Sequence, residues 1–116
     1  MIKFDEELES YTTEIDGITF TWEDEPPEDA EEQAAAAAAG YRERLPEIIA
    51  FMLPSLRQMY GEVTAEEAER KIGRPSIDLD AWQVSYCEQR FDDMHIFSFE
   101  FSDSDFQEFD YFSIDG

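Results

Sequence analysis

The sequence predicts an α+β domain in which helices cover one face of an antiparallel β-sheet. Segments of alternating apolar and polar residues lie near both ends of the chain, and a helix-favouring region lies between them. An N-terminal hairpin and a C-terminal three-stranded meander are expected to share one sheet of about four to six strands. The length of 116 residues suits a single domain, spanning residues 1–116, with one modest core.

The N-terminal hairpin is predicted from two alternating runs, residues 11–15 and 18–22, which flank Asp16 and Gly17. An Asp-Gly pair between such runs favours a two-residue hairpin turn. Residues 2–4 are expected to add a short strand or to pack against the hairpin. The acidic segment that follows predicts a linker into a helix, because the helix dipole favours carboxylates in the first turn.

The middle of the chain predicts two helical segments. The first covers residues 33–39, in which six consecutive alanines favour a helix that packs closely against its neighbours. Gly40 and Pro46 are expected to interrupt or bend it. Residues 48–59 then supply a broad apolar face, with a kink or break expected at Pro54.

A third, short helix follows. Gly61 is expected to end the preceding helix, and Thr64 with Glu67 three residues later predicts a capping box at the start of the next. Gly73 and Pro75 are expected to stop this helix.

The C-terminal meander is predicted from residues 82–87, 95–101 and 109–112, which alternate in polarity. Segments 89–93 and 102–105 between them are rich in acidic residues and predict turns. One face of this meander should be aromatic. The side chains expected on it are those of Trp82, Val84, Tyr86, His95, Phe97, Phe99, Phe101, Phe109 and Tyr111.

The net charge of −22 is the strongest indication of what the protein binds. A field of this sign repels nucleic acids and anionic membranes, and it attracts basic proteins. Cys87 is the one cysteine, so no disulfide can form within the chain. With no apolar run of roughly 18 residues and no signal-like start, the protein is expected to be cytoplasmic.

The acidic residues are segregated along the chain. Residues 1–32 hold thirteen acids and one base, residues 33–77 hold six of each, and residues 78–116 hold eleven acids and one base. The helical region is therefore neutral, while both β-regions are strongly negative. A general adaptation for solubility would place acids on the exposed helix faces as well. The segregation favours an acidic binding surface opposite a neutral helical layer.

The aromatic content of the β-regions exceeds what one sheet face needs for burial. Some of these rings are expected to lie exposed among carboxylates, as in a site for a basic partner. Phe106 or Tyr111 is the expected apolar anchor. The residues predicted to bind the partner are Glu23, Asp24, Glu25, Asp92, Asp93, Asp103, Asp105, Phe106, Glu108, Asp110 and Tyr111.

Catalytic and metal sites are weaker interpretations. His95 lies near two aspartates, as a general base would, but its place in an aromatic strand favours a structural role. Cys87 lacks any nucleophile motif and is expected to be a buried, inert thiol. The Asp-x-Asp pairs at residues 78–80 and 103–105 lack the rest of a calcium loop. No cofactor and no enzymatic activity are expected.

The ending FDDMHIFSFEFSDSDFQEFDYFSIDG resembles small bacterial proteins of uncharacterised families that are found beside polymorphic and contact-dependent toxins. The resemblance covers residues 48–116 and includes the order of helix and sheet. It implies an immunity protein, which neutralises a cognate toxin by occluding its active or substrate-binding surface. The resemblance carries over no functional residue.

Sequence and resemblance together lead to the hypothesis of a non-enzymatic inhibitor of a basic toxin, with a nuclease as a candidate. An array of carboxylates can occupy a cleft built for phosphates. Three alternatives stay open: an acidic secretion chaperone or adaptor, a DNA-mimic antagonist of a nucleic-acid-binding protein, and a small enzyme that uses His95 with Asp92 or Asp93.

Self-repulsion at this charge predicts a salt-dependent stability. We expect the urea midpoint of unfolding to rise between low and moderate salt, because ions screen the repulsion between carboxylates. Urea titrations at a series of NaCl concentrations measure this. A midpoint that stays constant or falls as salt is added would contradict it.

Overall fold

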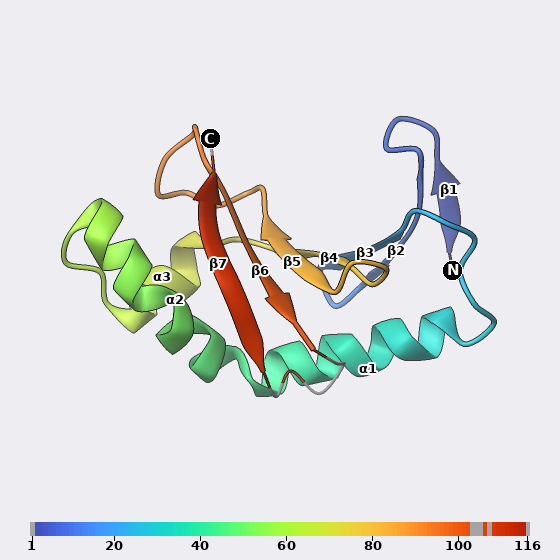
Figure 1. The fold of residues 1–116 in the computed structure, drawn as a ribbon, viewed down its shortest axis with the longest axis horizontal. Helices are drawn as coiled ribbons and strands as arrows, with labels where there is room; N and C mark the ends of the chain where they lie inside the picture. The colour runs from blue at the N-terminus through green and yellow to red at the C-terminus, as the bar shows by residue number, and fades with distance from the viewer. Residues whose placement is uncertain (1, 103–105, 107, 116) are drawn as a thin grey trace.

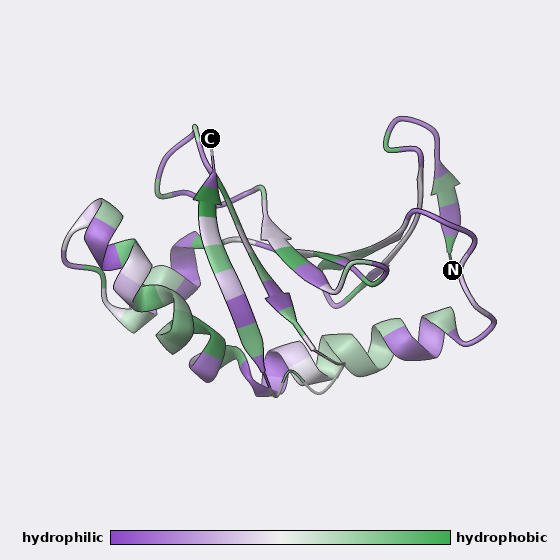
Figure 2. Ribbon diagram, in the orientation of Figure 1, coloured by the Kyte–Doolittle hydropathy of each residue, from purple (hydrophilic) through white to green (hydrophobic). Residues whose placement is uncertain are grey.

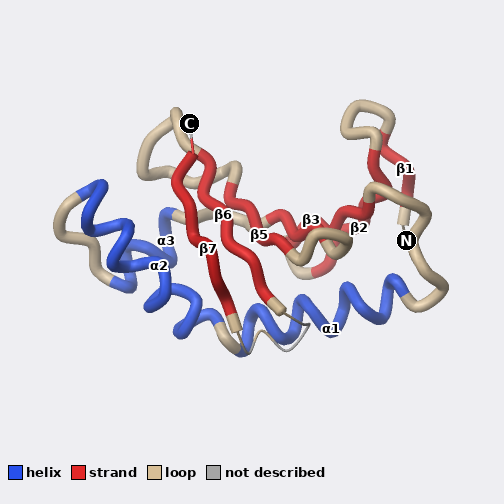
Figure 3. Tube along the Cα trace, viewed as in Figure 1, coloured by secondary structure: helices blue, strands red, loops and turns tan. Residues whose placement is uncertain are grey.

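The computed structural model describes residues 2–102, 106 and 108–115. Its architecture is α+β, with three helices and a seven-stranded, mostly antiparallel sheet whose strands follow in the order β1 to β7 (Figure 1). The helices gather on one side of the sheet (Figure 3). The elements are β1 (Lys3–Asp5), β2 (Ser10–Ile15), β3 (Ile18–Trp22), α1 (Ala30–Glu43), α2 (Leu45–Tyr60), α3 (Ala65–Lys71), β4 (Ser76–Asp78), β5 (Gln83–Tyr86), β6 (Ile96–Phe101) and β7 (Phe109–Asp115).

Strands β2 and β3 pair antiparallel around a two-residue turn, with Ile15 opposite Ile18. Asp16 and Gly17 both have left-handed backbones, with φ of 54° and 81°, as a type I′ turn requires. This turn matches the twist of its strands, which explains why an Asp-Gly pair stands here. Strand β1 pairs with β2 and forms one edge of the sheet.

Strand β4 joins the two halves of the sheet. It runs parallel to β3, with Phe20 opposite Ile77, and antiparallel to β5, with Ile77 opposite Val84. Parallel neighbours need a crossover connection, and the three helices provide it. With β1 and β4, each of three residues, the sheet has seven strands and exceeds the expected four to six.

Helix α1 packs closely against the sheet through its small residues. Ala34, Ala37 and Ala38 are buried, as expected for the alanine run, and so is Gly40. The expectation that Gly40 interrupts the helix is wrong, because α1 continues through the buried Gly40 to Glu43. The helix ends at Glu43, ahead of Pro46 in the first turn of α2.

Helix α2 continues through Pro54 without a break. Gly61, with φ of 88°, ends it as expected. Helix α3 starts at the predicted cap, where the Glu67 backbone N–H donates to Thr64 Oγ1 at 3.0 Å. The Glu67 side chain does not return to the cap but pairs with Lys71 at 3.3 Å.

An aromatic core lies between the helices and the sheet. Phe51 of α2 contacts the rings of Phe99, Phe109 and Phe112 with centroids 5.5–6.3 Å apart. Hydrophobic and hydrophilic residues alternate along much of β6 and β7 (Figure 2). Phe97, Phe99 and Phe101 of β6 are buried in this core, and Phe112 and Ile114 of β7 pack against it.

Four expectations for the meander are corrected by the structure. Trp82 has φ of 54° and lies before β5, so it leaves the core face. His95 precedes β6 and is half-buried. A bulge in β7, with Tyr111 at φ 59°, turns Tyr111 outward and Phe112 inward. Cys87 is exposed, because β5 ends at the buried Tyr86 and the next side chain points to the other face.

No helix among the described residues is long and apolar enough to cross a membrane.

One buried hydrogen bond ties α1 to the middle of the sheet. The hydroxyls of Tyr41 and Tyr86 lie 2.6 Å apart, and burial raises the pKa of Tyr41 to about 12. Replacing Tyr86 by Phe should reduce the free energy of unfolding by about 1–3 kcal/mol, because the Tyr41 hydroxyl is left buried and unpaired.

The double variant Y41F/Y86F is the control. It should cost less than the sum of the two single variants, since no unpaired hydroxyl remains. Urea unfolding of the four proteins measures this coupling. If the losses in the free energy of unfolding of the two single variants add up to that of the double variant, the hydrogen bond between the two hydroxyls contributes no stability.

Candidate protein-binding surface

Strand direction brings many of the exposed carboxylates to one end of the sheet. The β1–β2 turn, the C-terminal ends of β3, β4 and β6, and the start of β7 all lie along this end, from one edge of the twisted sheet to the other. We call it the acidic end. Its described carboxylates are Asp5, Glu6, Glu7, Glu9, Glu23, Asp24, Glu25, Asp78, Asp80, Glu100, Glu108 and Asp110.

The centre of the acidic end is held by two aspartates that accept backbone hydrogen bonds. Asp80 Oδ2 accepts from the N–H groups of Glu23 and Asp24, at 2.7 and 3.3 Å. Asp78 Oδ1 accepts from the N–H groups of Asp80 and Ala81. These bonds fix the loop after β3 against the β4–β5 turn, so the exposed side chains of Glu23 and Asp24 stand on a defined backbone.

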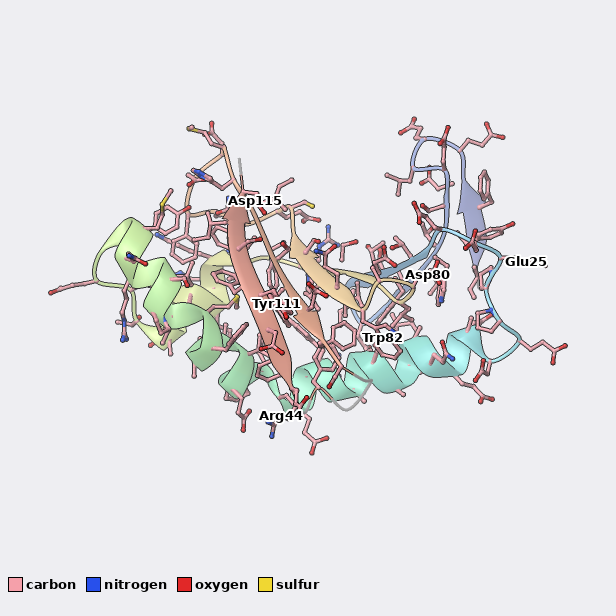
Figure 4. All side chains as sticks on the ribbon, in the orientation of Figure 1. Glu25, Arg44, Asp80, Trp82, Tyr111 and Asp115 are labelled. Atoms are coloured by element: carbon pink, nitrogen blue, oxygen red, sulfur yellow. The ribbon has the colours of Figure 1, made fainter. Side chains whose placement is uncertain are left out.

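Trp82 is the exposed aromatic residue in the middle of this end. Its side chain is 37% exposed and meets the Phe101 ring edge to face, with centroids 5.2 Å apart. Its carbonyl accepts from the Phe101 N–H at 3.0 Å. Figure 4 shows Trp82 between Asp80 and the start of β7. Because the ring is fixed on one side, little side-chain freedom remains to be lost on binding.

Carboxylates also face each other across the solvent-exposed side of the sheet. Asp78 pairs with Gln83, Gln83 with Glu100, and Glu100 with Asp110, so one row crosses β4 to β7. Directly opposed like charges destabilise a sheet. The Glu100–Asp110 pair therefore lowers the stability of the free protein, and a cation at this place would relieve the repulsion.

Basic residues are nearly absent from this surface. On the strands and turns of the acidic end, Lys3 is the one basic residue in the described chain. Arg44 lies on the helix side, where it donates to the Phe106 carbonyl and pairs with Glu47 (Figure 4). Other ion pairs of arginine and lysine lie outside the acidic end: Arg42–Asp16, Lys71–Glu67 and Arg74–Glu88.

The predicted binding residues divide between the two ends of the sheet. Glu23, Asp24, Glu25, Glu108, Asp110 and Tyr111 belong to the acidic end, and Tyr111 is 77% exposed. Phe106 is fully buried and stacks on Phe101 with centroids 4.3 Å apart, so it belongs to the core and is not an accessible anchor. Asp103 and Asp105 lie outside the described residues.

Asp92 and Asp93 lie at the opposite end, in the β5–β6 loop. Asp92 is a structural acceptor. Its Oδ2 lies 2.5 Å from the Tyr60 hydroxyl and 2.7 Å from His95 Nδ1, and its Oδ1 accepts from Gln89, Met94 and His95. The Tyr60 hydroxyl, with smaller effects of His95, Gln89 and the Met94 N–H, holds the pKa of Asp92 well below its usual range.

The His95–Asp92 contact has the form of an oriented base, but its setting is that of a loop lock. The His95 ring is half-buried, and Gln89 binds its carbonyl at 2.8 Å. Burial and the Asp92 hydrogen bond raise the pKa of Tyr60 above its usual value. Tyr60, Gln89 and His95 all hydrogen-bond with Asp92, and Gln89 also binds the His95 carbonyl. This closed network fits a structural role for His95.

Sequence inspection did not identify Asp78, Asp80, Trp82, Glu100 and the β1–β2 turn as parts of one surface. From the sequence, the Asp-Leu-Asp spacing at residues 78–80 indicates only a weak cation site. Among the described residues, no group of three histidines, cysteines or carboxylates could hold a metal ion. The parallel pairing of β3 with β4 places these residues at the same end of the sheet. No local sequence pattern predicts this long-range pairing.

Comparison of the chain with protein-family models, curated proteins and solved structures found no match. The function is therefore inferred from geometry and charge.

The Asp92 lock predicts a specific pH dependence. A carboxyl whose pKa is lowered by folding stabilises the protein above the pKa of the unfolded state, about 3.9, and loses that contribution as the pH falls toward the folded value. Asp92→Asn should thus be less stable than the natural protein at pH 7, and the difference should narrow below about pH 4.

Asp93→Asn is the matched control, since it removes the same charge from the exposed neighbouring residue. Urea unfolding between pH 2.5 and 7 compares the three proteins. Equal stability of D92N and D93N at pH 7 would refute the structural role of Asp92.

Proposed function

We propose that this protein is a non-enzymatic binding protein that captures a basic protein partner at its acidic end. The observation that carries the proposal is the imbalance of charge there. Within the described part of the chain, ten exposed carboxylates share this end with one basic residue, Lys3. A charge of this density costs stability in the free protein, and a cationic surface compensates for it.

Charge and aromatic side chains would play different parts in the complex. The carboxylates attract a basic partner over long range and raise the association rate, an effect that salt weakens. The exposed rings of Trp82 and Tyr111 supply apolar area that slows dissociation, as aromatic residues do at the centres of interfaces. The Asp80 side chain accepts hydrogen bonds from the backbone of Glu23 and Asp24, and these bonds hold the loop in place before the partner binds.

The partner we favour is a toxin, and the protein would act as a bacterial immunity protein. Nucleases offer cationic clefts to phosphate, so a nuclease toxin suits a rigid array of carboxylates. Binding would occlude the cleft sterically. A basic DNA-binding protein has the same surface chemistry, and the identity of the captured protein separates the two.

Charge reversal tests the site. We expect the triple variant E23K/D24K/E25K to lose a basic partner that tagged natural protein retains at low salt in a near one-to-one ratio. The matched control E43K/E62K/E69K changes the net charge equally on exposed helical-layer positions and should keep the partner. Association rates with the isolated partner, measured at low and high salt, should fall at least tenfold for the first variant only.

Equal losses in both triple variants would reject the acidic end as the site and leave only a general effect of net charge. The inhibitory role is tested separately. Production of the captured partner alone should arrest growth of a bacterial host, and co-production of the natural protein, but not of E23K/D24K/E25K, should restore it. A harmless partner would reject the immunity function while leaving the binding function intact.

A further inference from the structure

The free edge of β7 is the longest unpaired strand edge in the sheet. Among the described residues β7 pairs with β6 alone and stands last in the strand order. It has seven residues, against three in β1 at the other edge. Its first half carries the Tyr111 bulge, a device that blunts sheet edges. Residues 112–115 follow the bulge and remain available to pair with another strand.

An apolar hollow opens directly beside this part of the edge. It lies between α2 and β7, has a volume of about 210 Å³, and is lined by Ser55, Gln58, Met59, Phe112 and Ile114. Helix α2 lies beside β7 in the fold (Figure 1), and its residues Ser55, Gln58 and Met59 line one side of the hollow. A strand added to an open edge gains main-chain hydrogen bonds, and a pocket next to the edge selects one of its side chains.

Exposed apolar side chains also lie near this edge. Met59 on the rim of the hollow is 49% exposed, and Tyr111 on β7 is 77% exposed. Ile96, which pairs with Asp115 of β7, is 48% exposed, and Met94 just before it is 72% exposed. Four of the seven large exposed hydrophobic residues of the described chain thus lie on β7 or next to it.

The charges on the edge indicate what can bind there. Asp110 and Asp115 lie near the two ends of β7, which has no basic residue (Figure 4 labels Asp115 and Tyr111). A second copy of the chain would bring four carboxylates to one shared ladder and join two bodies of net charge −22 each. A basic segment would instead meet a carboxylate at each end.

We infer that the edge of β7 takes up an extended basic segment of a partner, which adds as an eighth strand and places an apolar side chain in the hollow beside Met59. The cationic nature of the segment rests on the proposed function. The hollow and residues 112–115 lie outside the acidic end, which reaches only the first half of β7 through Asp110 and Tyr111.

The test uses a panel of acetylated, amidated peptides of the form Lys-Val-Lys-X-Lys-Val-Lys, with X as Leu, Ile, Met or Phe, and the full-length protein. Fluorescence anisotropy of labelled peptides should show binding that depends on X, and amide exchange of residues 112–115 should slow when the peptide is bound. The same peptide with two consecutive central N-methyl groups should bind at least tenfold more weakly, because it cannot donate to the edge.

Two variants of equal charge locate the site. Met59→Lys puts a positive charge on the apolar rim of the hollow, where it repels the basic segment, and should weaken binding at least tenfold. Leu8→Lys, at an exposed position in the β1–β2 turn, should leave binding within twofold of the natural protein. No peptide binding, or equal binding by M59K and L8K, would overturn the inference. The variant E23K/D24K/E25K separates the two proposals: it should lose the partner but keep the peptides, so each can fail alone.

Discussion

The parallel contact between β3 and β4 is the constraint on which the rest of the structure depends. Three residue pairs, from Thr19–Ser76 to Thr21–Asp78, join an N-terminal β-region to a C-terminal one. Because parallel neighbours need a long crossover, all three helices must lie between these strands and cover one face of the sheet. The same contact makes both strands end at one place. The carboxylates after β3 therefore meet those after β4, and Asp80 binds the backbone of Glu23 and Asp24 across the junction.

This arrangement separates charge within one small body. The helical layer holds most of the arginines and lysines, and several of them pair with local acids. Among the described residues the acidic end has one cation, Lys3, and Glu100 lies directly opposite Asp110 in the β6–β7 ladder. An aromatic core and the buried Tyr41–Tyr86 hydrogen bond offset this cost. Such a balance between charge repulsion and core packing suits a protein whose excess negative charge is compensated when it binds a basic partner.

Much of the architecture could be predicted from the sequence, because it depends on local signals. The α+β class, the alanine helix, the Thr64 cap and the helix end at Gly61 all follow from residue type and spacing. Strand β4 could not be predicted, since three residues carry no periodicity and its partner β3 lies more than fifty residues away. Left-handed backbones at Trp82 and Tyr111 also break the alternation on which strand faces were assigned. For the same reasons the acidic clusters could be named one by one, while their assembly into one surface could not.

The most direct test of the central claim is the hydrogen-exchange footprint of the partner on the natural protein, recorded for the isolated one-to-one complex. The account predicts that protection concentrates at residues 5–10, 23–25, 78–82 and 108–111, with the exposed faces of the helices unchanged. Protection confined to the helical layer, with the acidic end exchanging as in the free protein, would contradict it.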